Sequence, residues 1–258
     1  MPTSPDPKPI TTAEIKPVEL ETNRASQEDA PPIGESLPWS QIGKAPERLD
    51  GHSGTPHDAG VNEAVDRFFD LALGELAALR TRAEIESIKV AANLVLDCES
   101  KGGRVHVTGI GKSEHIARYV ASLLSSTGTP AYFLHATECV HGSAGQVRAP
   151  DVTIAVSNSG TTPELMRAVD VLRGLGSKVI GVSGNRDSLL ASASDILLHA
   201  GVENEGGALN IVPRSSILAK TYVLCALSVA LETIKGLTRE QYARWHPGGA
   251  LGQLARDG

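Results

Sequence analysis

Two short stretches of the chain carry residues that suit anion chemistry. The first is GIGKS at 109–113, which follows an apolar run typical of a buried strand and precedes a helical pattern. A glycine turn at a helix N-terminus points backbone N–H groups at an anion, and Lys112 and Ser113 would add a cation and a hydroxyl. The stretch therefore predicts an anion-binding turn. The alternative is a structural turn with a solvated lysine.

Two familiar nucleotide-binding motifs do not fit this turn. A P-loop needs a glycine five residues before Gly-Lys-Ser, where this chain has His106. A dinucleotide fingerprint needs a third glycine where this chain has Glu114. ATP hydrolysis and nicotinamide chemistry are therefore disfavoured.

The second stretch is SNSGTT at 157–162, which closes another predicted strand and opens a helix. Its hydroxyls, its glycine and the N–H groups of a helix N-terminus predict a phosphate cradle that needs neither a metal nor a basic residue. Simple N-capping, with Thr162 as the cap and Pro163 at the first helical position, needs only one hydroxyl. We therefore favour phosphate binding. Its candidate residues are Ser113, Ser157, Ser159, Gly160, Thr161 and Thr162.

Strand and helix patterns alternate after Gly103, which is typical of a doubly wound α/β fold. Its sheet would be five-stranded and parallel, flanked by helices. Because parallel strands end at one edge of the sheet, the two anion-binding stretches should meet there. We predict strands at 104–109, 130–134, 151–157, 178–183 and 195–199, and helices at 113–127, 162–175, 187–193 and 215–235.

The N-terminal stretch differs from the rest of the chain. Residues 1–60 hold ten of the fifteen prolines and ten acidic residues against five basic ones. Such a segment buries too little apolar surface to offset its ordering entropy, so we predict a disordered acidic tail. From Val61, apolar residues recur every three to four positions and predict two consecutive helices. The folded domain is predicted to span 61–258.

Composition excludes several classes of function. A net charge of −6 and 3% aromatic residues argue against a general nucleic-acid binder. Three widely spaced cysteines indicate neither a disulfide framework nor a metal knuckle, and favour a reducing compartment. The first residues show no apolar targeting segment, and no run reaches about 18 apolar residues, the length of a membrane span. We expect a cytoplasmic protein without membrane contact.

Two further stretches complete a resemblance. They are HATECVHG at 135–142 and HPGGALG at 246–252. Together with GIGKS and SNSGTT, they resemble the sugar isomerase (SIS) family, and within it the arabinose 5-phosphate isomerases. The resemblance covers about 62–256 and implies a flavodoxin-like SIS fold. It also implies a cofactor-free and metal-free isomerase that interconverts arabinose 5-phosphate and ribulose 5-phosphate through an enediol.

The resemblance also assigns candidate catalytic residues. It places the functional lysine of the family at Lys112, two glutamates at Glu164 and Glu205, and two histidines at His141 and His246. An aldose–ketose isomerisation needs a base at C2, a proton carrier between O1 and O2, and a cation for the enediolate. Taken singly, Glu164 suits a first-turn acid and Glu205 a loop residue. The histidines lie in predicted loops, which favours function.

The chain departs from the pattern of the family at two positions. Ser143 stands where an aspartate is usual, and Arg214 stands where a threonine is usual. Arg214 adds a fork-shaped donor that would bind a second acidic group or a neighbouring carboxylate, so the substrate stays open. After HPGGALG the printed chain leaves no room for the paired CBS domains of many relatives.

Other functions remain open at this point. A different SIS isomerase, such as one acting on a hexulose phosphate, is the nearest alternative, and a non-catalytic phosphosugar sensor is another. The retained lysine, glutamates and histidines favour an enzyme. The resemblance also implies a homo-oligomer, a tetramer built as a dimer of dimers, in which the His246 segment completes the site of a neighbour.

Overall fold

A computed structural model describes residues 56–257 of the chain. The tail predicted for 1–60 falls almost entirely outside the described residues. The strands are β1 (Val105–Gly109), β2 (Ala131–Phe133), β3 (Val152–Ser157), β4 (Lys178–Ser183) and β5 (Ile196–His199). The helices are α1 (Pro56–Arg82), α2 (Ile85–Ser100), α3 (Lys112–Ser126), α4 (Ala136–Cys139), α5 (Pro163–Gly174), α6 (Leu189–Ala193), α7 (Ser215–Lys235), α8 (Arg239–Trp245) and α9 (Gly249–Asp257), and a 3₁₀ turn spans Ser143–Gln146.

The five strands form one parallel sheet in the order β2-β1-β3-β4-β5, which confirms the predicted flavodoxin-like doubly wound fold. Every residue of β1 and β3 is buried. This pattern is expected of central strands with helices on both faces of the sheet. The predicted strands agree with the structure to within one residue at each end.

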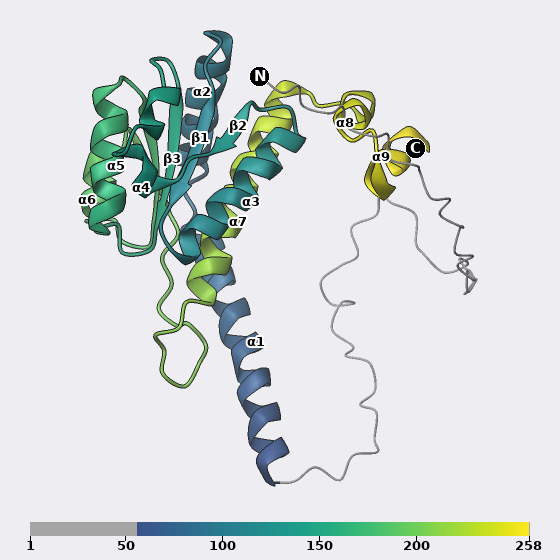
Figure 1. The fold of residues 1–258 in the computed structure, drawn as a ribbon. Coiled ribbons are helices and arrows are strands. Elements are labelled where there is room, and N and C mark those ends of the chain that lie inside the picture. Colours follow the sequence, from purple (N-terminus) through teal and green to yellow (C-terminus); the bar gives the residue numbers. More distant parts are fainter. Residues whose placement is uncertain (1–55, 258) are drawn as a thin grey trace, which may run out of the picture. The chain divides into compact units, whose positions relative to one another are not determined.

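The core has two parts, one on each face of the sheet (Figure 1). Buried side chains of α2, α3 and α7 cover one face, and those of α4, α5 and α6 cover the other. The predicted helix at 187–193 begins only at Leu189, because Ser188 is its N-cap and accepts a hydrogen bond from the Ala191 N–H. Helices α4, α8 and α9 were not predicted.

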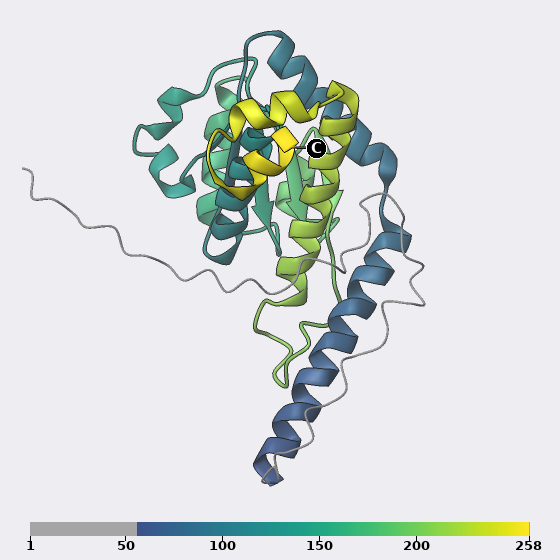
Figure 2. The same ribbon diagram turned by 90° about the vertical axis from the view of Figure 1, so that its right-hand side faces the viewer.

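Helix α7 lies at the centre of the helical layer. It packs against α1, α2 and α3, and Figures 1 and 2 show it beside α1. By length and composition it is the one helix among the described residues that would suffice to cross a membrane. However, its Leu224, Leu227 and Leu231 belong to the hydrophobic core, and it also buries Lys220, so it packs as a core helix.

Candidate active site

The two anion-binding stretches meet where the order of the sheet reverses. The chain passes from β1 to β2 on one side and then returns to β3 on the other, so β1 and β3 pair directly, with Gly109 opposite Val156. The crevice outside the strand ends at such a switch point is where open α/β sheets bind ligands. The structure thus brings 109–113 beside 157–162, as predicted (Figure 1).

A cavity of about 300 Å³ opens at this switch point. Five of the residues predicted for the site line it, namely Lys112, Ser113, Ser157, Ser159 and Thr162. The start of α7 closes another side. The complete lining is Ile110, Lys112, Ser113, Val156, Ser157, Asn158, Ser159, Thr162, Pro213, Ile217 and Lys220.

The loop between β3 and α5 is folded by its own hydroxyls. Ser157 Oγ accepts a hydrogen bond from the Gly160 N–H at 3.0 Å, and Ser159 Oγ accepts one from the Thr161 N–H at 3.3 Å. Gly160 has φ +65°, and a Cβ at this position would collide with Ser188. The loop therefore approaches its neighbours as only glycine permits.

Helix α5 opens towards the cavity without a side-chain cap. Thr162 is the N-cap and Pro163 follows it, as the capping alternative required, but the Thr162 hydroxyl makes no hydrogen bond to the helix. It lies 3.4 Å from Ser157 Oγ instead. Capping therefore does not account for these hydroxyls. A bound anion would meet both the hydroxyls and the first-turn amides of α5.

Lys112 is the first residue of α3 and is exposed at the cavity. Gly111 precedes it as the N-cap with φ +59° and ψ −127°, a conformation open to glycine and strained for other residues. Ser113 is buried one residue later. The turn thus sets an ammonium group and a hydroxyl at the end of β1 that faces the loop of β3.

Glu205 caps α7. Its Oε2 accepts hydrogen bonds from the backbone N–H groups of Arg214 at 2.6 Å and Ser216 at 3.1 Å. Burial opposes ionisation of this carboxyl, but hydrogen bonds from Ser216 and Arg214 and the charge of Lys220 hold its pKa below the usual 4.5. Glu205 therefore holds an anionic charge at the helix that closes the cavity, although it does not itself line the cavity.

We expect the Glu205→Gln variant to be less stable at neutral pH by about 1 kcal/mol, because the charge at a helix N-terminus is lost. A lowered pKa means that the stabilising effect is present above pH 4.5 and is lost as the pH falls through the folded pKa. Urea unfolding at pH 7 and pH 3.5 measures both effects. Glu63→Gln, at an exposed position within α1 beyond its first turn, is the matched control. A stability difference that persists unchanged at pH 3.5 would contradict this account.

Sequence reasoning missed the two remaining polar residues of the cavity, Lys220 and Asn158. The Lys220 side chain is buried at 0% exposure, and its Nζ donates to Asn158 Oδ1 at 2.9 Å. Burial lowers the pKa of Lys220 to about 8, against the opposing charge of Glu205. The available signal was a lysine inside an otherwise apolar stretch of the predicted helix at 215–235.

The two candidate histidines lie elsewhere. His141 is exposed after α4, and its backbone N–H donates to the Glu138 carbonyl. His246 ends α8, where its ring stacks on Tyr242 at 3.9 Å and its Nδ1 lies 3.0 Å from the Tyr242 carbonyl oxygen. Neither histidine lines the cavity of its own chain.

The length of α3 separates His246 from the cavity. The Trp245 ring lies against Gly128, just beyond the C-terminus of α3, whereas Lys112 begins that helix. From Lys112 to Ser126, α3 is about 21 Å long at 1.5 Å per residue. His246 therefore lies at the opposite end of α3 from the cavity.

Three other predicted residues do not line the cavity. Glu164 is exposed in the first turn of α5, Thr161 is exposed, and Gly160 is buried. Ser143, the first departure from the pattern of the family, begins the 3₁₀ turn. Among the described residues, no group of three or more His, Cys, Asp or Glu side chains is placed to hold a metal ion.

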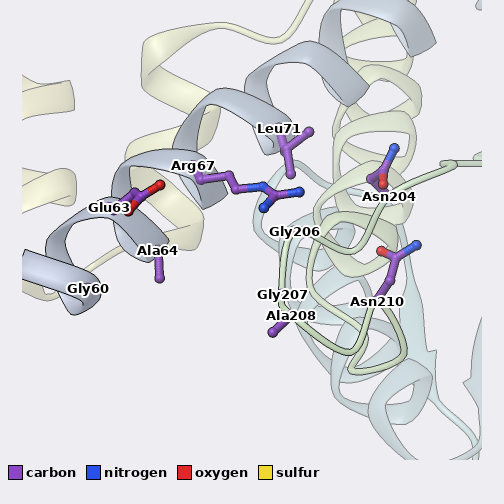
Figure 3. Close-up of a pocket in the computed structure, with 10 residues that line it drawn as sticks. All are labelled: Gly60, Glu63, Ala64, Arg67, Leu71, Asn204, Gly206, Gly207, Ala208 and Asn210. Atoms are coloured by element: carbon purple, nitrogen blue, oxygen red, sulfur yellow. The ribbon is translucent and has the colours of Figure 1, made fainter. Parts of the chain in front are cut away.

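A second cavity, of about 340 Å³, lies between α1 and the loop that carries Glu205 (Figure 3). Arg67 extends from α1 towards this loop, and Asn204 and Asn210 line the opposite side. The Arg214 guanidinium lies against Gly207 of the same loop. The backbone N–H of Arg214, rather than the guanidinium, binds the Glu205 carboxylate.

Comparison with known proteins agrees with this fold. The SIS domain model matches residues 100–230, which is half of the chain. The chain therefore belongs to the SIS domain family.

Within that family the chain is similar to proteins named arabinose 5-phosphate isomerase KdsD, as the sequence resemblance indicated. It is 40% identical over 168 residues to the one from Pseudomonas aeruginosa, covering 64% of this chain and 52% of the relative. It is 42% identical over 164 residues to the one from Escherichia coli K12, covering 62% and 50%. The chain thus spans about half the length of these curated relatives.

A solved structure is similar over its whole length. The protein c3406 of E. coli CFT073, solved in complex with A5P, superposes with a TM-score of 0.68 at 30% sequence identity. The match covers 75% of this chain and 100% of that one. The SIS fold predicted from the sequence is therefore confirmed.

Proposed function

We propose that this protein is an aldose–ketose isomerase that interconverts D-arabinose 5-phosphate and D-ribulose 5-phosphate. The observation that carries the proposal is the cavity at the switch point, where a cradle of hydroxyls and helix amides lies beside Lys112. A phosphate in the cradle would hold the sugar against the lysine. The names of the KdsD relatives and the A5P complex of c3406 support the choice of pentose phosphate.

The reaction transfers a proton between C1 and C2 through an enediol. We assign Lys112 to stabilise the negative charge that develops on the enediolate oxygens. Glu205, His141 and His246 would share ring opening and proton transfer, and Glu164 would assist from the first turn of α5. An imidazole has one nitrogen that can accept a proton and one that can donate it, as this transfer requires.

The position of His246 supports an assembly in which sites are shared. Because His246 lies at the far end of α3 from its own cavity, we propose that it completes the cavity of a neighbouring copy in a homotetramer. Exposed apolar side chains on α1 and α7, among them Phe69, Leu73 and Val229, offer surface for such contacts.

Three further parts of the proposal concern the chain as a whole. We propose a catalytic domain over 61–258, an N-terminal acidic tail, and a cytoplasmic location.

A phosphosugar sensor is the second candidate function, because the cradle alone would suffice for binding. The presence of Lys112 in the cavity favours the enzyme, since a sensor has no enediolate to stabilise.

Isotope exchange tests the proposal directly. The protein is incubated with arabinose 5-phosphate, and with other pentose and hexose phosphates as controls, in deuterated water. We expect deuterium at C2 of arabinose 5-phosphate together with formation of ribulose 5-phosphate, both followed by NMR. Isotope exchange with a hexose phosphate and not with arabinose 5-phosphate would assign a different substrate to the isomerase. Binding without exchange for every sugar would favour the sensor.

A further inference from the structure

Lys220 is a buried cation that the proposed chemistry does not yet use. It lies in the second turn of α7 and is fully buried, yet it forms part of the cavity wall. Lys112, at the start of α3, lines the same cavity and is exposed. The cavity therefore has one exposed lysine and one buried lysine.

Lys220 lacks a direct ion-pair partner among the described residues, although the charge of Glu205 acts on it from a greater distance. Its Nζ makes one hydrogen bond, to Asn158, although an ammonium group has three donors. Within the described part of the chain, no carboxylate lies within 4 Å of this nitrogen. A buried charge is costly unless it is paired. Holding Asn158 requires only a hydrogen-bond donor, which an uncharged side chain could supply. The positive charge of Lys220 therefore points to a further role.

Asn158 links Lys220 to the phosphate cradle. It stands between Ser157 and Ser159, and its backbone carbonyl accepts a hydrogen bond from the Gly184 N–H at 3.0 Å. Its side chain is thus held at one end of the loop, with the Lys220 ammonium beside it. An anion in the cradle would lie next to the two remaining donors of Lys220.

We propose that Lys220 binds the phosphate of the sugar phosphate in the cavity and supplies the charge that balances it. The inference rests on the proposed function and adds a phosphate ligand to it. An ammonium–phosphate hydrogen bond is charge-assisted, and removing one costs about 10- to 100-fold in affinity.

The protonation state of Lys220 distinguishes a role in phosphate binding from a role limited to holding the loop through Asn158. One ionisable group of the described residues acts on its charge, namely the Glu205 carboxylate that caps the same helix; Lys112 is the other lysine that lines the cavity. The pKa of Lys220, about 8, means that its charge is present at pH 7.5 and largely lost by pH 9. A neutral amine still donates to Asn158, so a role limited to holding the loop would not depend on pH in this range.

The experiment measures the affinity of the full chain for inorganic phosphate by calorimetry at pH 7.5 and pH 9. For the unsubstituted protein we expect affinity to weaken about eightfold between the two values as Lys220 deprotonates. At pH 7.5, Lys220→Met should bind phosphate about 10- to 100-fold more weakly than the unsubstituted protein. The affinity of this variant should change little between pH 7.5 and pH 9. Lys235→Met is the matched control, because this lysine of α7 pairs with Glu99 rather than lining the cavity. It should bind as the unsubstituted protein does.

Two results would overturn the proposal. One is an affinity of the unsubstituted protein that stays constant between pH 7.5 and pH 9, which requires no variant to fold. The other is a Lys220→Met protein, folded by circular dichroism, that keeps the full pH dependence. Phosphate binding that depends on Lys220 without any isotope exchange would remove the isomerase proposal alone. Isotope exchange together with phosphate binding that does not depend on Lys220 would remove only the proposal for Lys220.

Discussion

Replacing His246 with alanine should lower kcat by about 10²- to 10⁴-fold, the usual worth of a positioned proton carrier. A carbonyl oxygen only accepts hydrogen bonds, so the contact with Tyr242 places the proton on Nδ1 and leaves Nε2 as a base. The ring is further held by stacking on Tyr242 at 3.9 Å. Steady-state kinetics with arabinose 5-phosphate measures the loss.

Binding and assembly should survive this substitution. The phosphate cradle, to which His246 contributes nothing, should dominate phosphosugar affinity, and the contacts of the His246 ring are with Tyr242 of the same chain, so affinity and the mass of the oligomer should change little. Arg244→Ala is the matched control, because Arg244 lies on α8, is exposed, and pairs only with Glu240 among the described residues. Unchanged turnover in His246→Ala would remove His246 from the mechanism, and a change in oligomer mass would assign it to assembly.

Replacing Lys112 with methionine should lower kcat by about 10²- to 10³-fold, because the cation that stabilises the enediolate is lost from a partly enclosed cavity. Methionine keeps the length and apolar stem of the side chain. The separation of kcat from KM is informative, since a lysine that only paired with the phosphate would change KM instead. The measurement is initial-rate kinetics over a range of arabinose 5-phosphate concentrations.

The control for Lys112 is Lys101→Met. Lys101 is an exposed lysine that follows α2 and pairs with Asp97. Its loss should leave both kcat and KM unchanged. A Lys112→Met enzyme with an unchanged kcat and a raised KM would assign Lys112 to the phosphate, beside the role proposed for Lys220.

The sheet and its edge could be predicted because the signals are local. Apolar runs bounded by glycine and polar residues define β1 and β3, and a doubly wound topology then places their C-terminal ends side by side. Helices α8 and α9 escaped prediction because they are short and carry few buried residues. Tertiary contacts, such as that of Trp245 with Gly128, hold this part of the chain in place, and the local periodicity of the sequence does not reveal such contacts.

The site was harder to predict because it depends on tertiary contacts. Glu205 matched a motif position, but its hydrogen bonds to the start of α7 emerge only when the loop folds back on the helix. Lys220 stands three residues after Ile217 on an apolar helix, where a lysine normally extends to solvent. Only the packing of α7 over the strand ends reveals that this side chain turns inward.

The length of α3 has a consequence for how the activity would respond to the amount of protein. About 21 Å of helix separates Lys112 from the end against which Trp245 packs, so one chain cannot bring His246 to its own Lys112. With the proposed sharing of sites, turnover becomes a property of the assembled state and obeys mass action. Dilution below the dissociation constant of the oligomer would then lower specific activity while every chain stays folded.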